Sequence, residues 1–197
     1  MTTISYSLSN YQSIQESAIF AGGCFWCTEA VFLELNGVLN VLPGYIGGET
    51  SNPTYNEICK GTTGHAEAIK ISFDSKIITF EELLEVFFAT HDPTTLNRQG
   101  NDIGTQYRSE VFYTDENQKK ITLNYIDLLN NKFTFGKPIV TKVSEASIFF
   151  NAEEYHQNYY NQNNSQGYCS YIIRPKIEKL RNKFQSKLKN KNEHTNR

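Results

Sequence analysis

The sequence predicts an α+β fold, a two-layer sandwich in which helices pack against a mixed sheet with a ferredoxin-like core. The predicted elements follow one another as strand–helix–strand, again strand–helix–strand, and then helices. Apolar residues alternate in the predicted strands and recur at helical spacing in the predicted helices. With 197 residues, 39% of them hydrophobic, the chain is long enough for one ordinary domain with a sizeable core.

The first strand–helix unit surrounds Cys24. Residues 15–21 form the predicted strand, Gly22 and Gly23 turn the chain, and residues 25–35 form the predicted helix. Cys24 therefore lies at a helix N-terminus, where unpaired N–H groups and the helix dipole favour a thiolate. This position predicts a reactive thiol with a lowered pKa, whereas the alternative is a buried small apolar residue.

Two further strands and a helix are expected next. Residues 38–45 are apolar with a Pro-Gly interruption, which predicts a strand that breaks into a loop over residues 47–55. Residues 65–73 alternate between two faces and predict another strand. Residues 79–82 (Thr-Phe-Glu-Glu) form a capping box that opens a helix, and residues 91–93 (His-Asp-Pro) end it.

The C-terminal half continues the pattern. We expect a strand over residues 107–114, a helix over 115–130, a strand over 137–143, a capped helix from Asn151 and a polar loop over 161–166. Within the 115–130 helix, Ile121, Tyr125 and Leu128 are expected to face inward.

The charge is concentrated at the C-terminal end. Residues 176–197 hold eight Lys or Arg against two Glu, although the whole chain has a net charge of −2. Apolar residues recur there at helical spacing, at Ile177, Leu180, Phe184 and Leu188. This predicts a docked helix with solvated lysines rather than a nucleic-acid-binding segment. The expected organisation is an N-terminal arm over 1–14, one domain over 15–175, and a basic C-terminal helix or tail over 176–197.

Composition points to a cytoplasmic protein. No apolar run approaches the ~18 residues that span a membrane, and residues 1–15 lack the basic residue and apolar stretch of a secretory signal. Four cysteines in such a chain favour catalytic use over a disulfide framework. We expect no membrane or nucleic-acid partner, and a monomer, because no exposed heptad pattern indicates an obligate coiled coil.

The cysteines leave three chemistries open. Cys24 and Cys27 have the spacing of a dithiol redox motif. A zinc site would need a second ligand pair, but Cys59 and Cys169 stand alone and no histidine pair has suitable spacing. The third interpretation is a nucleophilic Cys24 with a distant resolving thiol at Cys169, which follows a polar loop in a mobile setting.

Glu67 is the most informative residue after Cys24. It shares the apolar face of its predicted strand with Ile69, Ile71 and Phe73. A carboxyl group there is either paired with a cation or has a pKa raised by desolvation. A carboxylic acid that is protonated near neutrality can act as a proton donor. The alternative is a carboxylate at the strand end that simply reaches water.

Four other residues carry weaker signals when taken singly. Tyr55 ends a Gly/Pro loop and Tyr107 begins a predicted strand, and both are typical of packing. Asp102, in the loop before Tyr107, is typical of an exposed turn residue. His156 shares a face with Ala152 and other core residues, which indicates a satisfied core histidine.

Nine short motifs occur in a fixed order. They are Gly-Cys-Phe-Trp at 23–26, Pro-Gly-Tyr at 43–45 with Gly-Gly at 47–48, Asn-Pro-Thr-Tyr at 52–55, Gly-His-Ala-Glu-Ala at 64–68, His-Asp-Pro-Thr-Thr at 91–95, Asn-Arg-Gln-Gly at 97–100, Asp-Ile-Gly-Thr-Gln-Tyr-Arg-Ser at 102–109, Ala-Glu-Glu-Tyr-His-Gln at 152–157 and Gly-Tyr-Cys at 167–169. Together they resemble the type A peptide methionine sulfoxide reductases, over about residues 17 to 172.

The resemblance implies reduction of methionine-S-sulfoxide, peptide-bound and free, in protein repair and oxidative-stress defence. It implies the following roles: Cys24 as nucleophile, Glu67 as proton donor to the sulfoxide oxygen, Tyr55 and Tyr107 as hydrogen-bond donors to that oxygen, Asp102 as support, and Phe25 and Trp26 as the apolar pocket for the substrate methyl group. Such chemistry is coherent, because a sulfoxide oxygen is a poor leaving group until it is protonated.

The resemblance also implies how the thiol is recycled. Attack leaves Cys24 as a sulfenic acid, which condenses with a second thiol to an intramolecular disulfide. Many family members have Gly where this chain has Cys27, so we expect Cys169 as the resolving thiol and Cys27 as the alternative. Thioredoxin or a small dithiol is the implied external reductant, with no bound cofactor. Cys59 is expected to be structural.

Two other functions compete with this interpretation. The alternative enzyme is a general dithiol–disulfide oxidoreductase that uses Cys24 and Cys27. A third, non-enzymatic hypothesis is a zinc- or nucleic-acid-binding module, motivated by the cysteines and the basic tail.

Overall fold

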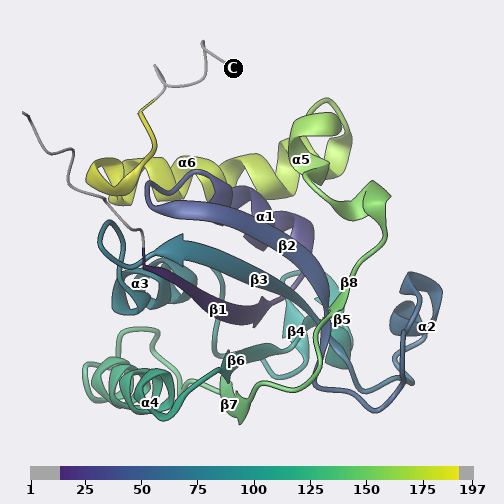
Figure 1. Ribbon diagram of the computed structural model, residues 1–197, viewed down its shortest axis with the longest axis horizontal. Coiled ribbons are helices and arrows are strands. Elements are labelled where there is room, and N and C mark those ends of the chain that lie inside the picture. Colours follow the sequence, from purple (N-terminus) through teal and green to yellow (C-terminus); the bar gives the residue numbers. More distant parts are fainter. Residues whose placement is uncertain (1–13, 191–197) are drawn as a thin grey trace, which may run out of the picture.

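The computed structural model describes residues 14–190, which form a mixed sheet with helices packed against it (Figure 1). The sheet contains β1 (Gln15–Gly22), β2 (Val38–Ile46), β3 (Ala66–Asp74), β6 (Ser109–Tyr113), β7 (Lys142–Glu145) and β8 (Phe150–Asn151), and a separate hairpin contains β4 (Arg98–Gln99) and β5 (Asp102–Ile103). The α-helices are α1 (Phe25–Leu33), α2 (Tyr55–Cys59), α3 (Phe80–Thr90), α4 (Glu116–Asn131), α5 (Tyr159–Gln162) and α6 (Arg174–Lys183). Shorter helical turns are η1 (Thr105–Tyr107), η2 (Glu154–His156), η3 (Cys169–Ile173) and η4 (Gln185–Lys187).

The strand order confirms the predicted fold class. The sheet runs β7-β6-β1-β3-β2-β8, and its neighbours are antiparallel except for the parallel pair β6 and β7. The inner order β6-β1-β3-β2, with crossovers through α1 and α3, is the ferredoxin-like arrangement. This arrangement puts β3 at the centre of the sheet, directly beneath α1.

The main core lies between the helices and one face of the sheet. Phe20 of β1 stacks on Phe87 of α3 with ring centroids 4.8 Å apart, and both side chains are buried. On the strand β3, Glu67 points to this same face because it alternates in register with Ile69 and Ile71, which are fully buried. The carboxyl group of Glu67 is therefore directed toward α1.

Capping boxes open two of the helices. Thr79 accepts a hydrogen bond from the Glu82 N–H, and the Glu82 side chain accepts one from the Thr79 N–H, as the sequence predicts for α3. The same reciprocal pair joins Thr54 and Glu57 at the start of α2. The predicted loop over residues 47–55 therefore ends where α2 begins, at Tyr55, and no element was predicted for the rest of α2.

Several C-terminal elements differ from the predictions. The strand predicted from residue 107 starts at Ser109, because Tyr107 lies in η1. The strand predicted over 137–143 forms later in the chain, as β7 from Lys142 to Glu145. Val140 is not part of it, because its N–H donates to the Pro93 carbonyl instead of to a neighbouring strand. The capped helix predicted from Asn151 does not form, since Asn151 pairs with β2 in β8.

The inward face predicted for the long helix is also partly wrong. Helix α4 forms as expected, and Ile121 and Tyr125 pack against the core. Leu128, however, is 44% exposed, and its neighbour Leu129 takes the packing position.

The basic C-terminal segment is docked as predicted. Helix α6 runs along α1 and contacts α3, and Ile177, Leu180 and Phe184 are buried (Figure 1). Beyond it, Asn36 donates its N–H to the carbonyl of Lys187 at 2.8 Å, so the chain after α6 lies against the end of α1. Helix α6 crosses the boundary expected between residues 175 and 176.

The predicted N-terminal arm, apart from Ile14, and residues 191–197 of the tail lie outside the described residues. Within residues 14–190, no helix is both long enough and apolar enough to cross a membrane.

Leu180 provides a test of this docking. Replacing Leu180 with Ala should lower the free energy of unfolding by about 2–5 kcal/mol, because a fully buried side chain is lost from the core that α6 shares with α1 and α3. Urea unfolding would measure the change. Lys179→Ala, exposed on the same helix, is the matched control and should change stability by no more than about 0.5 kcal/mol. If Leu180→Ala and Lys179→Ala lowered the free energy of unfolding by equally small amounts, the result would contradict the docking of α6.

Candidate active site

The turn before α1 requires glycine. Gly23 has φ of 92°, a left-handed conformation that costs glycine no strain. A Cβ atom at Gly23 would lie 2.5 Å from Cγ of Gln99, so only glycine lets the β4–β5 hairpin approach the turn. The Gln99 amide is itself held by two hydrogen bonds of 3.1 Å with the backbone of Asp92. This packing fixes Cys24 at the N-cap of α1, as the sequence predicts.

Cys24 and Cys27 form a buried thiol pair in the first turn of α1. Cys24 is 8% exposed and Cys27 is 1% exposed, and their side chains are hydrogen-bonded to each other. Burial, followed by this hydrogen bond, raises the pKa of the Cys24 thiol. The hydrogen bond from Cys24 lowers the pKa of Cys27 to about 7. The predicted lowering of the Cys24 pKa is therefore wrong, because negative charge forms first on Cys27.

Glu67 faces the start of the same helix. Its side chain is 1% exposed, and its Oε2 accepts a hydrogen bond from the Phe25 N–H at 3.1 Å. Burial raises the pKa of Glu67 to about 8, against a smaller lowering by the Phe25 N–H. The carboxyl group is therefore mostly protonated at neutral pH. The hypothesis of a raised pKa is confirmed, and the alternative of a carboxylate that reaches water is wrong.

Tyr55 and Tyr107 approach Glu67 from two other segments. Tyr55 begins α2, and its N–H donates to Oε1 of Glu153 at 2.8 Å. Tyr107 ends η1. Burial and then the charge of Glu67 raise the pKa of both phenols, so each hydroxyl remains a hydrogen-bond donor. If Tyr55 and Tyr107 were packing residues alone, their hydroxyl groups would not both need to lie near the Glu67 carboxyl group.

Asp102 is linked to the thiol pair through one hydroxyl group. It lies half-buried in β5, and its Oδ2 accepts a hydrogen bond from the Tyr168 hydroxyl at 3.1 Å. The Tyr168 oxygen also lies 3.7 Å from the Cys27 sulfur. The prediction of an exposed turn residue is therefore wrong for Asp102.

Aromatic rings form the wall beside Cys24. Trp26 stacks on Tyr159 with centroids 3.7 Å apart and planes 6° apart. Its indole Nε1–H donates to Nδ1 of His156 at 3.0 Å, and His156 is 1% exposed. The prediction of a core histidine is confirmed, but the prediction that it is satisfied is wrong, because its buried Nε2 has no hydrogen-bond partner among the described residues. Phe25 is fully buried, with its ring 5.0 Å from that of His156. These contacts hold the Trp26 ring in one orientation.

Glu29 positions the partner of Trp26. Its carboxyl oxygens accept the backbone N–H groups of Asn158 at 2.6 Å and Tyr159 at 3.2 Å. Burial raises the pKa of Glu29 to about 7, although both hydrogen bonds lower it. The buried carboxyl group thus ties α1 to the start of α5 and brings Tyr159 onto Trp26.

Cys169 lies in a different setting from the one predicted. Instead of following a mobile loop, it belongs to a helical run over residues 167–183, in the π-helical turn η3. It is fully buried and packs in one cluster with Cys24 and Cys27. Cys59, expected to be structural, is exposed at the end of α2. The fold therefore brings Cys24, Cys27 and Cys169 together and leaves Cys59 apart from them.

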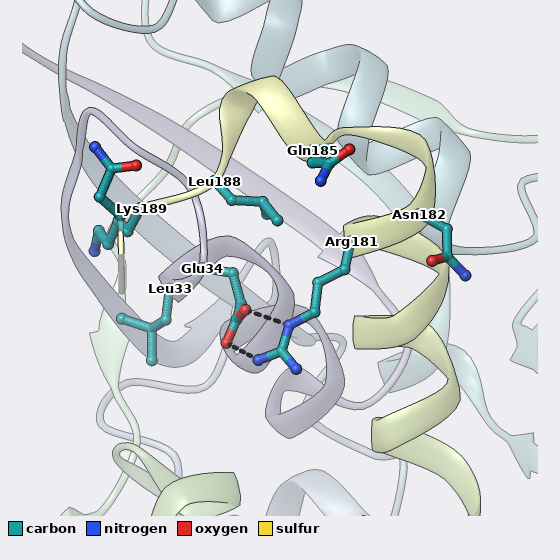
Figure 2. Close-up of a pocket in the computed structure, with 8 residues that line it drawn as sticks. Leu33, Glu34, Arg181, Asn182, Gln185, Leu188 and Lys189 are labelled. Carbon is teal, nitrogen blue, oxygen red and sulfur yellow. Dashed lines mark hydrogen bonds and ion pairs between the residues drawn. The ribbon is translucent and has the colours of Figure 1, made fainter. Parts of the chain in front are cut away.

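A separate cavity of about 410 Å³ lies between the end of α1 and the C-terminal segment (Figure 2). Figure 2 shows the Glu34 carboxylate facing Arg181, which donates from Nε at 2.8 Å and from Nη2 at 3.0 Å. None of the predicted site residues lines this cavity. The pair of Glu34 and Arg181 beside it connects the end of α1 to α6. Within the described range, no group of three or more His, Cys, Asp or Glu side chains is placed to hold a metal ion.

Comparison with known proteins agrees with this site. A family model described as peptide methionine sulfoxide reductase matches residues 16–188. The chain belongs to this family. The peptide methionine sulfoxide reductase MsrA of Acinetobacter baumannii (strain AYE) is 55% identical over 175 residues, which cover 89% of this chain and 99% of that protein.

Solved structures of the family are also similar. Mxr1 from Saccharomyces cerevisiae in reduced form gives a TM-score of 0.72 at 34% identity, covering 85% of this chain and 94% of that one. Mxr1 in complex with Trx2 gives a TM-score of 0.52 at 26% identity, covering 80% and 90%. The resemblance of the motifs to peptide methionine sulfoxide reductases is thus confirmed, and the protein is an oxidoreductase.

The peptide methionine sulfoxide reductase site includes residues that the sequence analysis did not single out. They are Glu29, Tyr159 and Tyr168. Glu29 carried a usable signal, because it is a carboxyl group in an otherwise apolar helix, as Glu67 is in an apolar strand face. Tyr159 and Tyr168 carried none, since their partners Trp26 and Asp102 are distant in sequence.

Glu67→Gln should change how stability depends on pH. The pKa of Glu67 rises from 4.5 to about 8 on folding, so its contribution is fully present below about pH 4.5 and is lost as pH rises toward 8. Relative to the Gln variant, the wild type should therefore lose up to ~1.4 kcal/mol of unfolding free energy per pH unit across this window. Urea unfolding at several pH values would measure it, with Glu81→Gln, exposed on α3, as the control for the substitution. A pH-independent difference for Glu67→Gln would contradict a protonated carboxyl group.

Proposed function

We propose that the protein reduces methionine-S-sulfoxide, peptide-bound and free, to methionine, and so repairs oxidised proteins during oxidative stress. The observation that carries the proposal is the buried, protonated Glu67, which faces the helix turn that presents Cys24. A sulfoxide needs a nucleophile at sulfur and an acid at oxygen, and these two groups meet that need.

Cys24 passes its proton to the neighbouring Cys27, whose pKa is about 7, and attacks the sulfoxide sulfur as a thiolate. Glu67 gives its own proton to the sulfoxide oxygen. The bond between Cys24 Sγ and the substrate sulfur forms first, and the oxygen then passes to Cys24. Methionine leaves and Cys24 remains as a sulfenic acid. The net change is the transfer of one oxygen atom from the substrate sulfur to the cysteine sulfur.

Tyr55 and Tyr107 donate hydrogen bonds to the same oxygen. Both hydroxyls stay protonated at neutral pH because burial raises their pKa. Donors that are already in place stabilise the charge that grows on oxygen without reorganising solvent. Asp102 supports this network from β5, where its charge acts on Tyr107.

Phe25 and Trp26 form the apolar pocket for the substrate methyl group. The stacking on Tyr159 and the hydrogen bond to His156 keep Trp26 fixed, so the pocket is preorganised. Specificity for the S epimer follows if the methyl group lies on this wall while the oxygen points to Glu67.

The sulfenic acid is converted to an intramolecular disulfide with Cys169, or with Cys27 as the alternative. Thioredoxin or a small dithiol then reduces the disulfide, and no bound cofactor is needed. The structural similarity to Mxr1 in complex with Trx2 supports a thioredoxin partner. We further propose a monomer that acts in the cytoplasm without nucleic-acid or membrane partners.

The general dithiol–disulfide oxidoreductase is not favoured. Exchange between thiols requires an attacking thiolate and a leaving thiol. It gives no role to a protonated Glu67 or to the two tyrosine hydroxyls beside it.

Single-turnover reduction of the two separated methionine sulfoxide epimers tests the proposal. Without external reductant, the wild type should release about one equivalent of methionine from the S epimer and essentially none from the R epimer. Cys24→Ser should release none, since a hydroxyl is a far weaker nucleophile, while Cys59→Ser should still react. Folded wild-type protein that releases methionine from neither epimer would overturn the proposal.

The two tyrosines should each matter to the chemical step. Tyr55→Phe or Tyr107→Phe removes one donor to the developing oxyanion and should slow single-turnover methionine release by about 10²-fold, up to 10³-fold. Tyr113→Phe, a half-buried tyrosine at the end of β6, is the matched control. Rates equal to the control for both variants would assign the tyrosines to packing.

A further inference from the structure

Arg108 follows Tyr107 directly in the chain, and its guanidinium group is buried in an ion pair behind the site. Arg108 is 8% exposed and Glu110 is 4% exposed. Nε of Arg108 donates to Oε2 of Glu110 at 2.5 Å, and the Ser144 hydroxyl donates to Oε1 of Glu110 at 2.6 Å. Glu110 points away from the helices, because it alternates in β6 with Val111, which packs in the main core. The proposed reaction gives this pair no role.

The guanidinium group joins two segments that carry groups of the site. Nη1 of Arg108 donates to the Thr105 carbonyl at 3.0 Å and to the Gly64 carbonyl at 3.1 Å. Thr105 begins η1, which ends at Tyr107, and Gly64 lies in the turn that leads into β3 and Glu67. One nitrogen atom of Arg108 therefore links the segment of Tyr107 to the segment of Glu67.

The turn before β3 is also held on its other side. His65 is 2% exposed, and its Nδ1 accepts a hydrogen bond from the Gly48 N–H at 3.0 Å. The ring proton is therefore on Nε2, which donates to the Thr50 carbonyl at 2.7 Å. The neighbouring loop packs closely on the guanidinium group, since a Cβ atom at Gly47 would lie 2.9 Å from Nη2 of Arg108. With the turn fixed in this way, the contact that sets the position of η1 against it is Arg108.

Stability alone is a poor reason for this buried ion pair. Two charges lose their hydration on burial, and replacing such a pair by apolar residues is often neutral or stabilising. A guanidinium group, in contrast, holds its N–H donors in one rigid plane and so fixes the spacing of its acceptors. Glu110 orients that plane, and Ser144 holds Glu110. The pair thus provides a defined geometry between the carbonyl groups of Thr105 and Gly64.

We propose that Arg108 is a positioning residue that holds the Tyr107 hydroxyl at the distance from Glu67 that the sulfoxide oxygen requires. Arg108 acts through these two residues and does not touch the substrate. The proposal rests on the proposed reduction of methionine sulfoxide, in which Tyr107 and Glu67 bind the same oxygen. A misplacement of such groups by about 1 Å can cost about 10²-fold in rate.

Single-turnover methionine release from the S epimer tests this role. Arg108→Met should slow release by about 10²-fold, and Arg108→Lys, which keeps the charge but not the planar group, by about tenfold. The loss should lie in the maximal rate and not in the substrate concentration that gives half of it, because the oxygen contacts strengthen in the transition state. Arg174→Met, exposed at the start of α6, is the matched control and should react at the wild-type rate.

A double-mutant cycle separates positioning from a loss of stability. In Tyr107→Phe the hydroxyl that Arg108 positions is absent, so adding Arg108→Met should slow release by less than about tenfold further. Leu84→Ala removes a fully buried side chain from α3 and serves as the control for lost stability. It should change the rate of the folded protein little, and by the same factor with or without Tyr107→Phe.

The double variant Arg108→Met/Glu110→Gln keeps the test decisive where Arg108→Met alone does not fold, because it leaves no unpaired buried charge. It should unfold at a urea concentration close to that of the wild type and still release methionine slowly. Wild-type release by folded Arg108→Met or by this double variant would overturn the proposal. So would an equal effect of Arg108→Met with and without the Tyr107 hydroxyl. Absence of methionine release from the wild type would instead mark failure of the proposed function.

Discussion

The hydrogen bond from the Phe25 N–H to Glu67 is the contact on which the site depends. Glu67 comes from the central strand β3 and Phe25 from the first turn of α1, so this bond joins the sheet to the helix that carries the thiols. Burial removes the hydration that would favour a carboxylate, and the pKa rises to about 8. A neutral carboxyl group can satisfy an unpaired helix N–H and still keep a proton to donate. One interaction thus meets a structural need and a chemical one.

The remaining polar contacts of α1 keep the helix in register with that carboxyl group. A helix of nine residues is marginal by itself, so tertiary contacts must fix its position. Glu29 ties its middle to the start of α5, and the bidentate pair of Glu34 and Arg181 ties its end to α6. A shift of α1 would move the thiols and the Trp26 wall away from Glu67 together. The basic C-terminal segment therefore contributes to the geometry of the site, and its Ile177 packs in the same cluster as the three cysteines.

Periodicity and capping were enough to predict the parts of the fold that local sequence decides. Strand β3 and the capping box of α3 form as expected, and Glu67 was identified because a charge in an apolar stripe has few physical explanations. The helix predicted from Asn151 failed because pairing with β2 outweighed a local capping signal. Cys169 was misplaced because the residues before it are polar, while burial of Ile173 and Ile177 extends the helix back to it. Ile173 and Ile177 pack against residues of α1, and only the fold brings α1 close to them.

The pKa of Cys24 shows which physical effect the sequence could not weigh. A helix N-terminus stabilises a nearby anion by about 0.3–1 kcal/mol, whereas full burial can shift a pKa by roughly 3–5 units, at 1.36 kcal/mol each. At Cys24 the effect of burial therefore outweighs that of the helix N-terminus, and the thiol stays protonated. Because thiolates are the forms that oxidants attack, a protonated, buried Cys24 is protected from nonspecific oxidation. In the proposed reaction it becomes reactive when Cys27 takes its proton and Glu67 supplies one to the substrate, so activation would require both partners and a bound sulfoxide at the same time.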